Sequence, residues 1–329
     1  MLKFTHSLLA SGLGAILAAV ASCAVLAQAY PHKPVRLLVG FTGGSTSDVI
    51  GRVVAQKLGE SLGQQVLVEN RPGAGANIAA EIVAKSAPDG YTTLYANTGI
   101  AVAISAYEKL GYDVLRDLAP VGQAAASPHI LVVNMSLPVQ SVKDLIALVK
   151  AKPLALNVAS TGSGNSDHFA YELFRSMTGA EMTHIVYKGG PQAMIDVMSG
   201  QVAAYFAGMA VASPLMRTGK AKALAVTSGK RSPLAPDIPT FRETGYTKHI
   251  AASFFGIYVP SGTPKPIVDK LNHTIVKLGS NPEFQKHHMI PRGLTPVFDT
   301  PEHFAKALES DRHDGLDAIK TSGLYPKVK

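Results

Sequence analysis

Short apolar runs rich in β-branched residues alternate with amphipathic segments along most of the chain. This pattern predicts β-strands joined by helices, as in α/β proteins whose sheets are mostly parallel. A first series has predicted strands at 35–41, 66–69 and 92–96, and a second has them at 130–134, 155–159, 183–187, 202–206 and 223–227. A late strand is predicted at 254–259, and helices are predicted at 264–279, 282–289 and 301–320.

Two consecutive series of strands and helices predict two lobes. A length of 329 residues suits two lobes of ordinary domain size. The late strand follows a complete second series, so its simplest path is a return to the first sheet. We therefore expect a discontinuous first lobe of residues 30–128 plus 252–329, and a second lobe of residues 129–251.

Two loops rich in Gly, Ser and Thr lie where a predicted buried strand ends and a helix begins, at 41–48 and 160–167. A helix start offers free backbone N–H groups and the positive end of the helix dipole, and hydroxyl groups add further donors. Helix capping by Asp48, and by Asn165 or Ser166, explains part of this composition. It does not explain the clusters at both strand ends, where open α/β sheets bind their ligands. The sequence therefore predicts one anion-binding loop in each lobe.

The first 29 residues have the features of a secretory signal peptide. Lys3 precedes an apolar run over residues 8–26, and Ala-Gln-Ala at 27–29 is a cleavage signature. Ser and Gly interrupt the run, which distinguishes it from a membrane-spanning helix of about 20 apolar residues. An alternative is a lipobox ending at Cys23, in which that cysteine is acylated and retained.

We expect the exported chain to begin at Tyr30. Cys23 is the single cysteine of the sequence, so cleavage after Ala29 leaves no disulfide, thiolate nucleophile or cysteine-based metal site. N-terminal sequencing of the exported protein tests this prediction, and a lipid-modified Cys23 would contradict it.

Charge and composition exclude several classes of protein. Hydrophobic residues make up 47% of the chain and charged residues 16%, which excludes a disordered chain. The formal net charge is +8, but the Lys and Arg residues are scattered and form no basic run of the kind that binds nucleic acid. We expect no nucleic-acid partner and a diffuse positive field that favours small anions.

Motifs for catalysis or cofactor binding have simpler explanations. Residues 59–63 match G-x-S-x-G, but a predicted helix precedes them and a strand follows, the reverse of a serine-hydrolase elbow. Residues 73–79 imitate a dinucleotide fingerprint, but they lie on the second βα unit and Pro72 crowds the turn. The histidines lack the spacing of metal ligands. We therefore expect no cofactor, metal or catalytic residue.

A set of short motifs covers nearly all of the sequence after residue 29. In chain order they are YP-x-KPV at 30–35, VENRPGAG at 68–75, PDGYT at 88–92, H-x-x-x-ELF at 168–174, YKG at 187–189, GQV at 200–202, LAVTS at 224–228, KRSP at 230–233, PDIPT at 236–240 and GTP at 262–264. With these motifs in this order, the chain resembles the extracytoplasmic solute receptors of tripartite tricarboxylate transporters, the Bug-type periplasmic receptors.

The resemblance implies a two-lobed periplasmic-binding-protein (Venus flytrap) fold with the ligand in the cleft between the lobes. It implies a periplasmic receptor, which we expect to be a monomer, that delivers a small carboxylate to a membrane permease. That carboxylate is a di- or tricarboxylate, an amino acid or an aromatic acid, held by backbone N–H groups, hydroxyls and ordered water. Alternatives are an exported sensor or scaffold without a ligand, and an exported hydrolase or lyase that uses a histidine.

The family's binding positions map onto both lobes of this chain. In the first lobe they are Phe41, Gly44, Ser45, Thr46, Asn97 and Thr98, and in the second lobe Ser160, Thr161, Gly162, Ser163, Gly164, Tyr187, Lys188 and Gly189. Some neighbouring positions depart from the family pattern. Thr42 and Gly43 replace prolines of the first loop, and Asn165 and Asp167 replace hydroxyl residues of the second. These departures leave the identity of the ligand open.

Overall fold

A computed structural model describes residues 30–97, 99–107, 109–246 and 253–322. The predicted signal peptide, Cys23 and Thr98 lie outside the described residues.

The first of two sheets has six strands in the order β11-β4-β10-β3-β1-β2. These strands are β1 (Val35–Val39), β2 (Val66–Asn70), β3 (Thr92–Asn97), β4 (Leu118–Ser127), β10 (Ser253–Pro260) and β11 (Thr295–Pro296). Strand β1 runs parallel to β2 and β3, whereas β10 runs antiparallel to both β3 and β4. The predicted late strand is β10, and it joins the first sheet.

The second sheet has five strands in the order β7-β6-β8-β5-β9. These strands are β5 (His129–Val133), β6 (Asn157–Ser160), β7 (Thr183–Val186), β8 (Ala204–Gly208) and β9 (Lys222–Val226). Strand β6 is parallel to β7 and β8, and β5 is antiparallel to β8 and β9.

The α/β class is confirmed, but the sheets are mixed rather than mostly parallel. The difference in the first sheet comes largely from β10, which lies between β3 and β4 and runs opposite to both. Its partner β4 is a strand that the sequence pattern did not predict. Its sequence, LAPVGQAAAS, contains one β-branched residue and is rich in Ala, so it has little intrinsic strand preference. It forms a strand because β10 pairs with it along its length, from Leu118 to Ser127.

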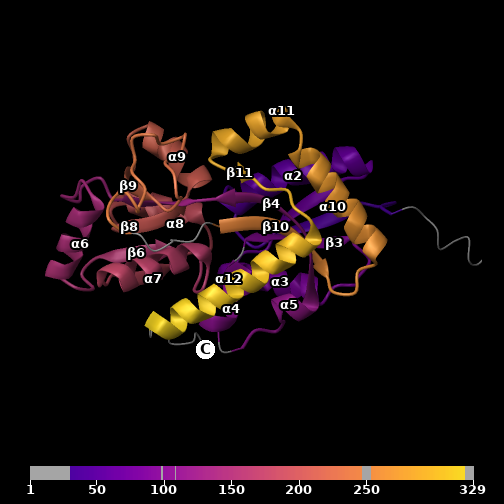
Figure 1. The fold of residues 1–329 in the computed structure, drawn as a ribbon, viewed down its shortest axis with the longest axis horizontal. Helices are drawn as coiled ribbons and strands as arrows, with labels where there is room; N and C mark the ends of the chain where they lie inside the picture. Colours follow the sequence, from indigo (N-terminus) through magenta and orange to yellow (C-terminus); the bar gives the residue numbers. More distant parts are fainter. Residues whose placement is uncertain (1–29, 98, 108, 247–252, 323–329) are drawn as a thin grey trace, which may run out of the picture.

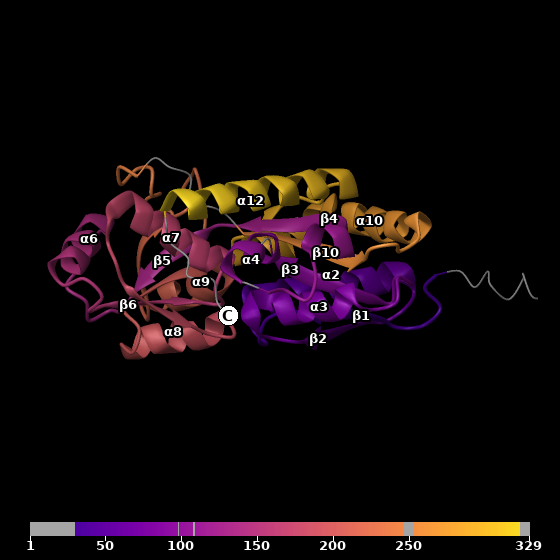
Figure 2. The ribbon, with the colours of Figure 1, turned by 90° about the horizontal axis from the view of Figure 1, so that it is seen from below.

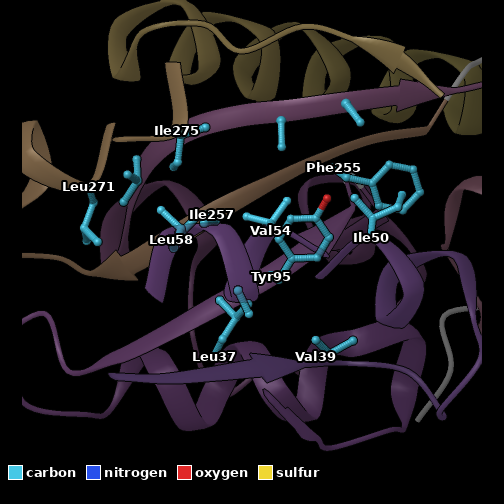
Figure 3. Close-up of a cluster of buried hydrophobic side chains, with 14 of the residues drawn as sticks. Leu37, Val39, Ile50, Val54, Leu58, Tyr95, Phe255, Ile257, Leu271 and Ile275 are labelled. Carbon is cyan, nitrogen blue, oxygen red and sulfur yellow. The ribbon is translucent and has the colours of Figure 1, made fainter. Parts of the chain in front are cut away.

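Helices cover both faces of the first sheet. They are α2 (Thr46–Leu62), α3 (Asn77–Ala84), α4 (Gly99–Ala106), α5 (Val114–Asp117), α10 (Lys265–Gly279), α11 (Pro282–Phe284) and α12 (Pro301–Ser322), with short helical turns at Ala74–Ala76, Gln285–Met289 and Ile290–Arg292. Helix α2 has apolar residues at intervals of four, Ile50, Val54 and Leu58, as expected for one buried helix face. These side chains pack against the sheet and α10 in the core drawn in Figure 3.

Helices also cover both faces of the second sheet. They are α6 (Val142–Ala151), α7 (Ser166–Thr178), α8 (Gly190–Ser199) and α9 (Met209–Arg217). Alternate residues of β5 enter opposite cores, because successive strand side chains point to opposite faces. Leu131 and Val133 pack in the core with α6 and α7, and Ile130 and Val132 pack in the core with α8 and α9.

The two sheets, each with its helices, lie side by side along the long axis of the molecule (Figure 1). Pro128 alone separates β4 in the first sheet from β5 in the second. Helix α12 packs on α4 and β4 and also contacts α7, so it reaches the second half of the molecule (Figure 2). Within the described residues, no helix is both long and apolar enough to cross a membrane.

Candidate functional site

A small cavity lies between the two sheets, where strand ends and helix starts meet. It has a volume of about 40 Å³ and is lined by Phe41, Ser45, Thr46, Ser47, Asn97, Ser127, His129, Thr161, Asn165, Ser166, Asp167, Gly190, Tyr205, Gly208, Val211, Ser253 and Phe255. This volume accommodates only a few water molecules. Four of the described helices, α2, α7, α8 and α9, begin at its wall.

The start of α2 is fixed by two reciprocal hydrogen bonds. The Ser45 hydroxyl caps the helix by accepting from the Asp48 N–H (3.2 Å), and the Asp48 carboxylate accepts from the Gly44 N–H (2.9 Å). Burial on its own would raise the pKa of Asp48, but hydrogen bonds from Arg52, the Gly44 N–H and Asn70 outweigh it, and the pKa lies below its usual value. The Asp48 charge is therefore neutralised by Arg52, one turn further along α2, and by its other hydrogen-bond donors. The N–H groups of Thr46 and Ser47, earlier in the first helical turn, have no intrahelical acceptor and remain available.

The loop before α2 is also tied to the end of β2. The Asn70 side-chain amide donates to the Phe41 carbonyl and to the Asp48 carboxylate, both at 2.8 Å. Asn70 belongs to the VENRPGAG segment, so that segment helps to position the cavity wall although it does not line the cavity.

The start of α7 repeats this design with other residues. Asn165 is the N-cap and accepts from the Ser166 N–H (2.8 Å), and His168 Nδ1 accepts from the Gly164 N–H (3.0 Å). The Asp167 carboxylate is buried at the cavity wall and accepts from the N–H and the hydroxyl of Thr161, at 2.8 and 2.7 Å. Burial raises the pKa of Asp167, and the hydrogen bonds from Thr161 oppose that rise.

The starts of α8 and α9 have no side-chain cap. Their N-cap residues are Gly189 and Gly208, and neither helix start receives a side-chain hydrogen bond at the cap. Gly190 and Gly208 line the cavity. The first N–H groups of these helices are therefore left for water or a ligand.

Positive charge at the cavity comes from helix ends rather than from side chains. Among the described residues that line it there is no lysine or arginine. His129 is 4% exposed, and burial lowers its pKa to about 4, so the ring is neutral at pH 7. Its Nε2 atom lies 3.2 Å from the Ser253 hydroxyl, which is 2.5 Å from the Ser166 hydroxyl.

The neutral state of His129 predicts that the protein loses stability in mild acid. The unfolded chain takes up a proton near pH 6.5 but the folded ring only near pH 4, so stability falls as pH decreases between these values. The difference corresponds to roughly 3 kcal/mol of unfolding free energy once both forms are protonated. Chemical denaturation at pH 7 and pH 4.5 should show a smaller loss for His129→Gln than for the wild type. Equal losses would contradict the prediction.

Loops from the two sheets touch beside the cavity. The Asn97 amide donates to Asn165 Oδ1 (2.9 Å) and to the Ser166 hydroxyl (3.2 Å). A Cβ atom added to Gly162 would lie 2.5 Å from the Cα atom of Gly75, so the two backbones meet without room for a side chain.

The structure brings part of the predicted binding set to the cavity wall. Phe41, Ser45, Thr46, Asn97 and Thr161 line it. The remaining described members lie beside it and have other contacts. The N–H groups of Gly44 and Gly164 donate to side chains of α2 and α7, and the Ser160 hydroxyl lies 2.6 Å from His184. Gly162 and Ser163 lie next to Gly75, and Gly189 lies against Thr42. The Tyr187 hydroxyl donates to Asp196, and Lys188 is exposed. Their roles in binding remain predictions.

Several lining residues were not predicted as binding residues. They are Ser47, Ser127, His129, Asn165, Ser166, Asp167, Gly190, Tyr205, Gly208, Val211, Ser253 and Phe255. The starts of α8 and α9 also follow strand ends, so the rule that found the first two loops could have found them. Ser127, His129 and Ser253 lie where the chain passes between the sheets, and only the topology places them here. No group of three or more His, Cys, Asp or Glu side chains among the described residues is placed to hold a metal ion.

Two mixed sheets with helix starts gathered around a small cavity between them form the two-lobed architecture of periplasmic binding proteins. Residues 50–320 match the family model described as the tripartite tricarboxylate transporter family receptor. Protein BugT of Bordetella pertussis is 37% identical over 309 residues, which are 92% of this chain and 93% of BugT. The chain therefore belongs to the tripartite tricarboxylate transporter receptor family, and it is a solute-binding protein rather than an enzyme.

Solved structures agree with this assignment. The periplasmic binding protein BugD superposes with a TM-score of 0.86 at 31% identity, covering 90% of this chain and 99% of BugD. The Rhodopseudomonas palustris protein Rpa4515, solved with adipate, superposes with a TM-score of 0.86 at 34% identity, covering 89% of this chain and 98% of that protein.

Proposed function

We propose that this protein is a periplasmic receptor that captures a small carboxylate between its lobes and delivers it to the membrane permease of a tripartite tricarboxylate transporter. The observation that carries the proposal is the convergence of four helix starts on one small cavity whose described lining contains no lysine or arginine. Such a site favours an anion through backbone N–H groups and helix dipoles. Adipate, the ligand named for the Rhodopseudomonas palustris protein, belongs to the same chemical class.

In this proposal the carboxylate sits at the start of α2. The N–H groups of Thr46 and Ser47 and the Ser45 hydroxyl donate to it, and the starts of α8 and α9 face it from the second lobe. A hydrogen bond to a charged group contributes roughly 1.5–3 kcal/mol. Two or three such bonds from each lobe supply much of the roughly 8 kcal/mol that micromolar affinity requires.

Ligand entry requires the two lobes to separate. The proposed lobes are residues 30–128 plus 252–329, and residues 129–251. A cavity of about 40 Å³ is too small for a dicarboxylate, and the loops around it touch each other. We propose a hinge where β4 passes into β5 and where the chain returns to β10.

The experiment that tests the function is native mass spectrometry of the purified protein, followed by thermal shift with a panel of carboxylates. A retained small carboxylate, released chemically unchanged on denaturation, supports a receptor. True ligands raise the melting temperature by mass action. Absence of any shift with every carboxylate contradicts the proposal, and chemical conversion of the ligand contradicts the assignment as a non-enzyme.

A further inference from the structure

A carboxylate side chain stands inside this anion-favouring cavity. Asp167 lines the cavity and is 2% exposed, and among the described lining residues no lysine or arginine accompanies it. Resting on the function proposed above, we propose that Asp167 selects an amino-carboxylate, a ligand that carries an ammonium group besides its carboxylate, over the same carboxylate without the ammonium group.

The hydrogen bonds around Asp167 leave mainly acceptor atoms on the cavity wall that Thr161, Asp167 and Tyr205 form. The Thr161 hydroxyl donates its proton to Asp167 (2.7 Å) and accepts from the Asn165 side-chain amide (2.6 Å). The Tyr205 hydroxyl also donates to Asp167, at 3.3 Å. Both hydroxyl protons are therefore committed to the carboxylate, so only lone pairs of these oxygens are free for a ligand.

The cavity wall at the start of α2 instead offers hydrogen-bond donors. Ser45 uses a lone pair to cap α2, so its hydroxyl proton is free. The first N–H groups of α2 add further donors beside it. A carboxylate fits this first wall, and a donor group fits the wall of Asp167, Thr161 and Tyr205.

The charge of the ligand group that faces Asp167 decides how well that group fits. A second carboxylate would bring its charge next to the buried Asp167 carboxyl, and it would find the neighbouring hydroxyl protons already in use. An ammonium group would add a cationic group, which the described lining lacks, and it would donate to several oxygens at once. A hydrogen bond between charged groups in a buried site changes affinity by about ten-fold or more.

The test uses pairs of ligands that differ only in the amino group. L-aspartate is compared with succinate, L-glutamate with glutarate, and L-leucine with 4-methylpentanoate, by calorimetry at pH 7.5. In the pair that binds best, the wild type should bind the amino member at least ten-fold more tightly. Asp167→Asn should reduce that ratio by ten-fold or more, because it removes the charge but keeps the shape.

Two further variants make the result interpretable. Asp144→Asn removes an acid from the first turn of α6, which does not line the cavity, and should leave the ratio unchanged. Asp167→Ser provides a second test if circular dichroism shows that the asparagine variant does not fold. Tighter or equal binding of the members without an amino group by the wild type would overturn this inference and leave the receptor function standing. An unchanged ratio in both Asp167 variants would do the same. Binding of no carboxylate from either series would refute the proposed function, and this inference with it.

Discussion

Gly208→Ala should weaken carboxylate binding by more than ten-fold while leaving the fold intact. The Gly208 backbone has φ −65° and ψ 139°, which any residue adopts, so alanine causes no strain within its own lobe. Its Cβ atom would nevertheless lie 2.5 Å from the hydroxyl oxygen of Thr46, at the start of α2. Thr46 is β-branched and has few rotamers with which to clear that space. The methyl group should therefore hold the two cavity walls apart.

Calorimetry with the best ligand of the panel measures this effect, and small-angle scattering measures whether the liganded variant stays more extended than the wild type. Gly229→Ala is the matched control, because a Cβ atom there has no neighbour within 4 Å. Adding Thr46→Ala should restore compaction, since the nearest remaining atom, the Cβ of residue 46, lies 3.5 Å away. Wild-type affinity of Gly208→Ala would show that these walls do not approach each other in the complex.

Ser45→Asp should lower carboxylate affinity by an order of magnitude or more. Aspartate is a good N-cap, so α2 should still form. Its negative charge, however, would take the place proposed for the ligand carboxylate at the helix start. Calorimetry gives the affinity, and circular dichroism confirms the fold.

Helix α6 offers a closely matched control for this variant. Ser141 caps α6 by accepting from the Asp144 N–H, and the Asp144 carboxylate accepts from the Gln140 N–H, the same pattern as at α2. Ser141→Asp should therefore have the same local effect on its helix and none on binding. Ser61→Ala, in the G-x-S-x-G segment within α2, should also change nothing. Unimpaired binding by Ser45→Asp would place the ligand on a different loop.

Strands with a strong local hydrophobic pattern could be predicted from the sequence. Strands that form only by pairing with a distant strand could not. Strand β1, with the sequence VRLLV, is apolar except for the exposed Arg36 and forms within the predicted range 35–41. Strand β4 is the counterexample, because its Ala-rich sequence becomes a strand only through pairing with β10, more than 120 residues later in the chain. The direction of β10, opposite to both β3 and β4, makes the first sheet mixed, and local pattern does not reveal strand direction.

Some residues of the candidate site could likewise be predicted from the sequence, and others could not. Ser45 and Thr161 lie on loops whose composition marks a helix start after a strand, so the sequence identifies them. Ser127 and Ser253 face each other in the register of β4 and β10, and His129 lies next to them in space. Single small polar residues where the chain passes between the sheets have no recognisable local sequence pattern. Only the assembled topology brings them to the cavity.

The pairing of β4 with β10 also restricts how the molecule can open. The two strands pair from Leu118 with Pro260 as far as Ser127 with Ser253, so both passages between the sheets leave the first sheet side by side. Two separate tethers would let the halves twist and slide past each other. A hydrogen-bonded strip bends across its width but resists shear, because sliding would break its ladder. In the proposed opening, the two lobes therefore rotate about this paired strip rather than slide along it.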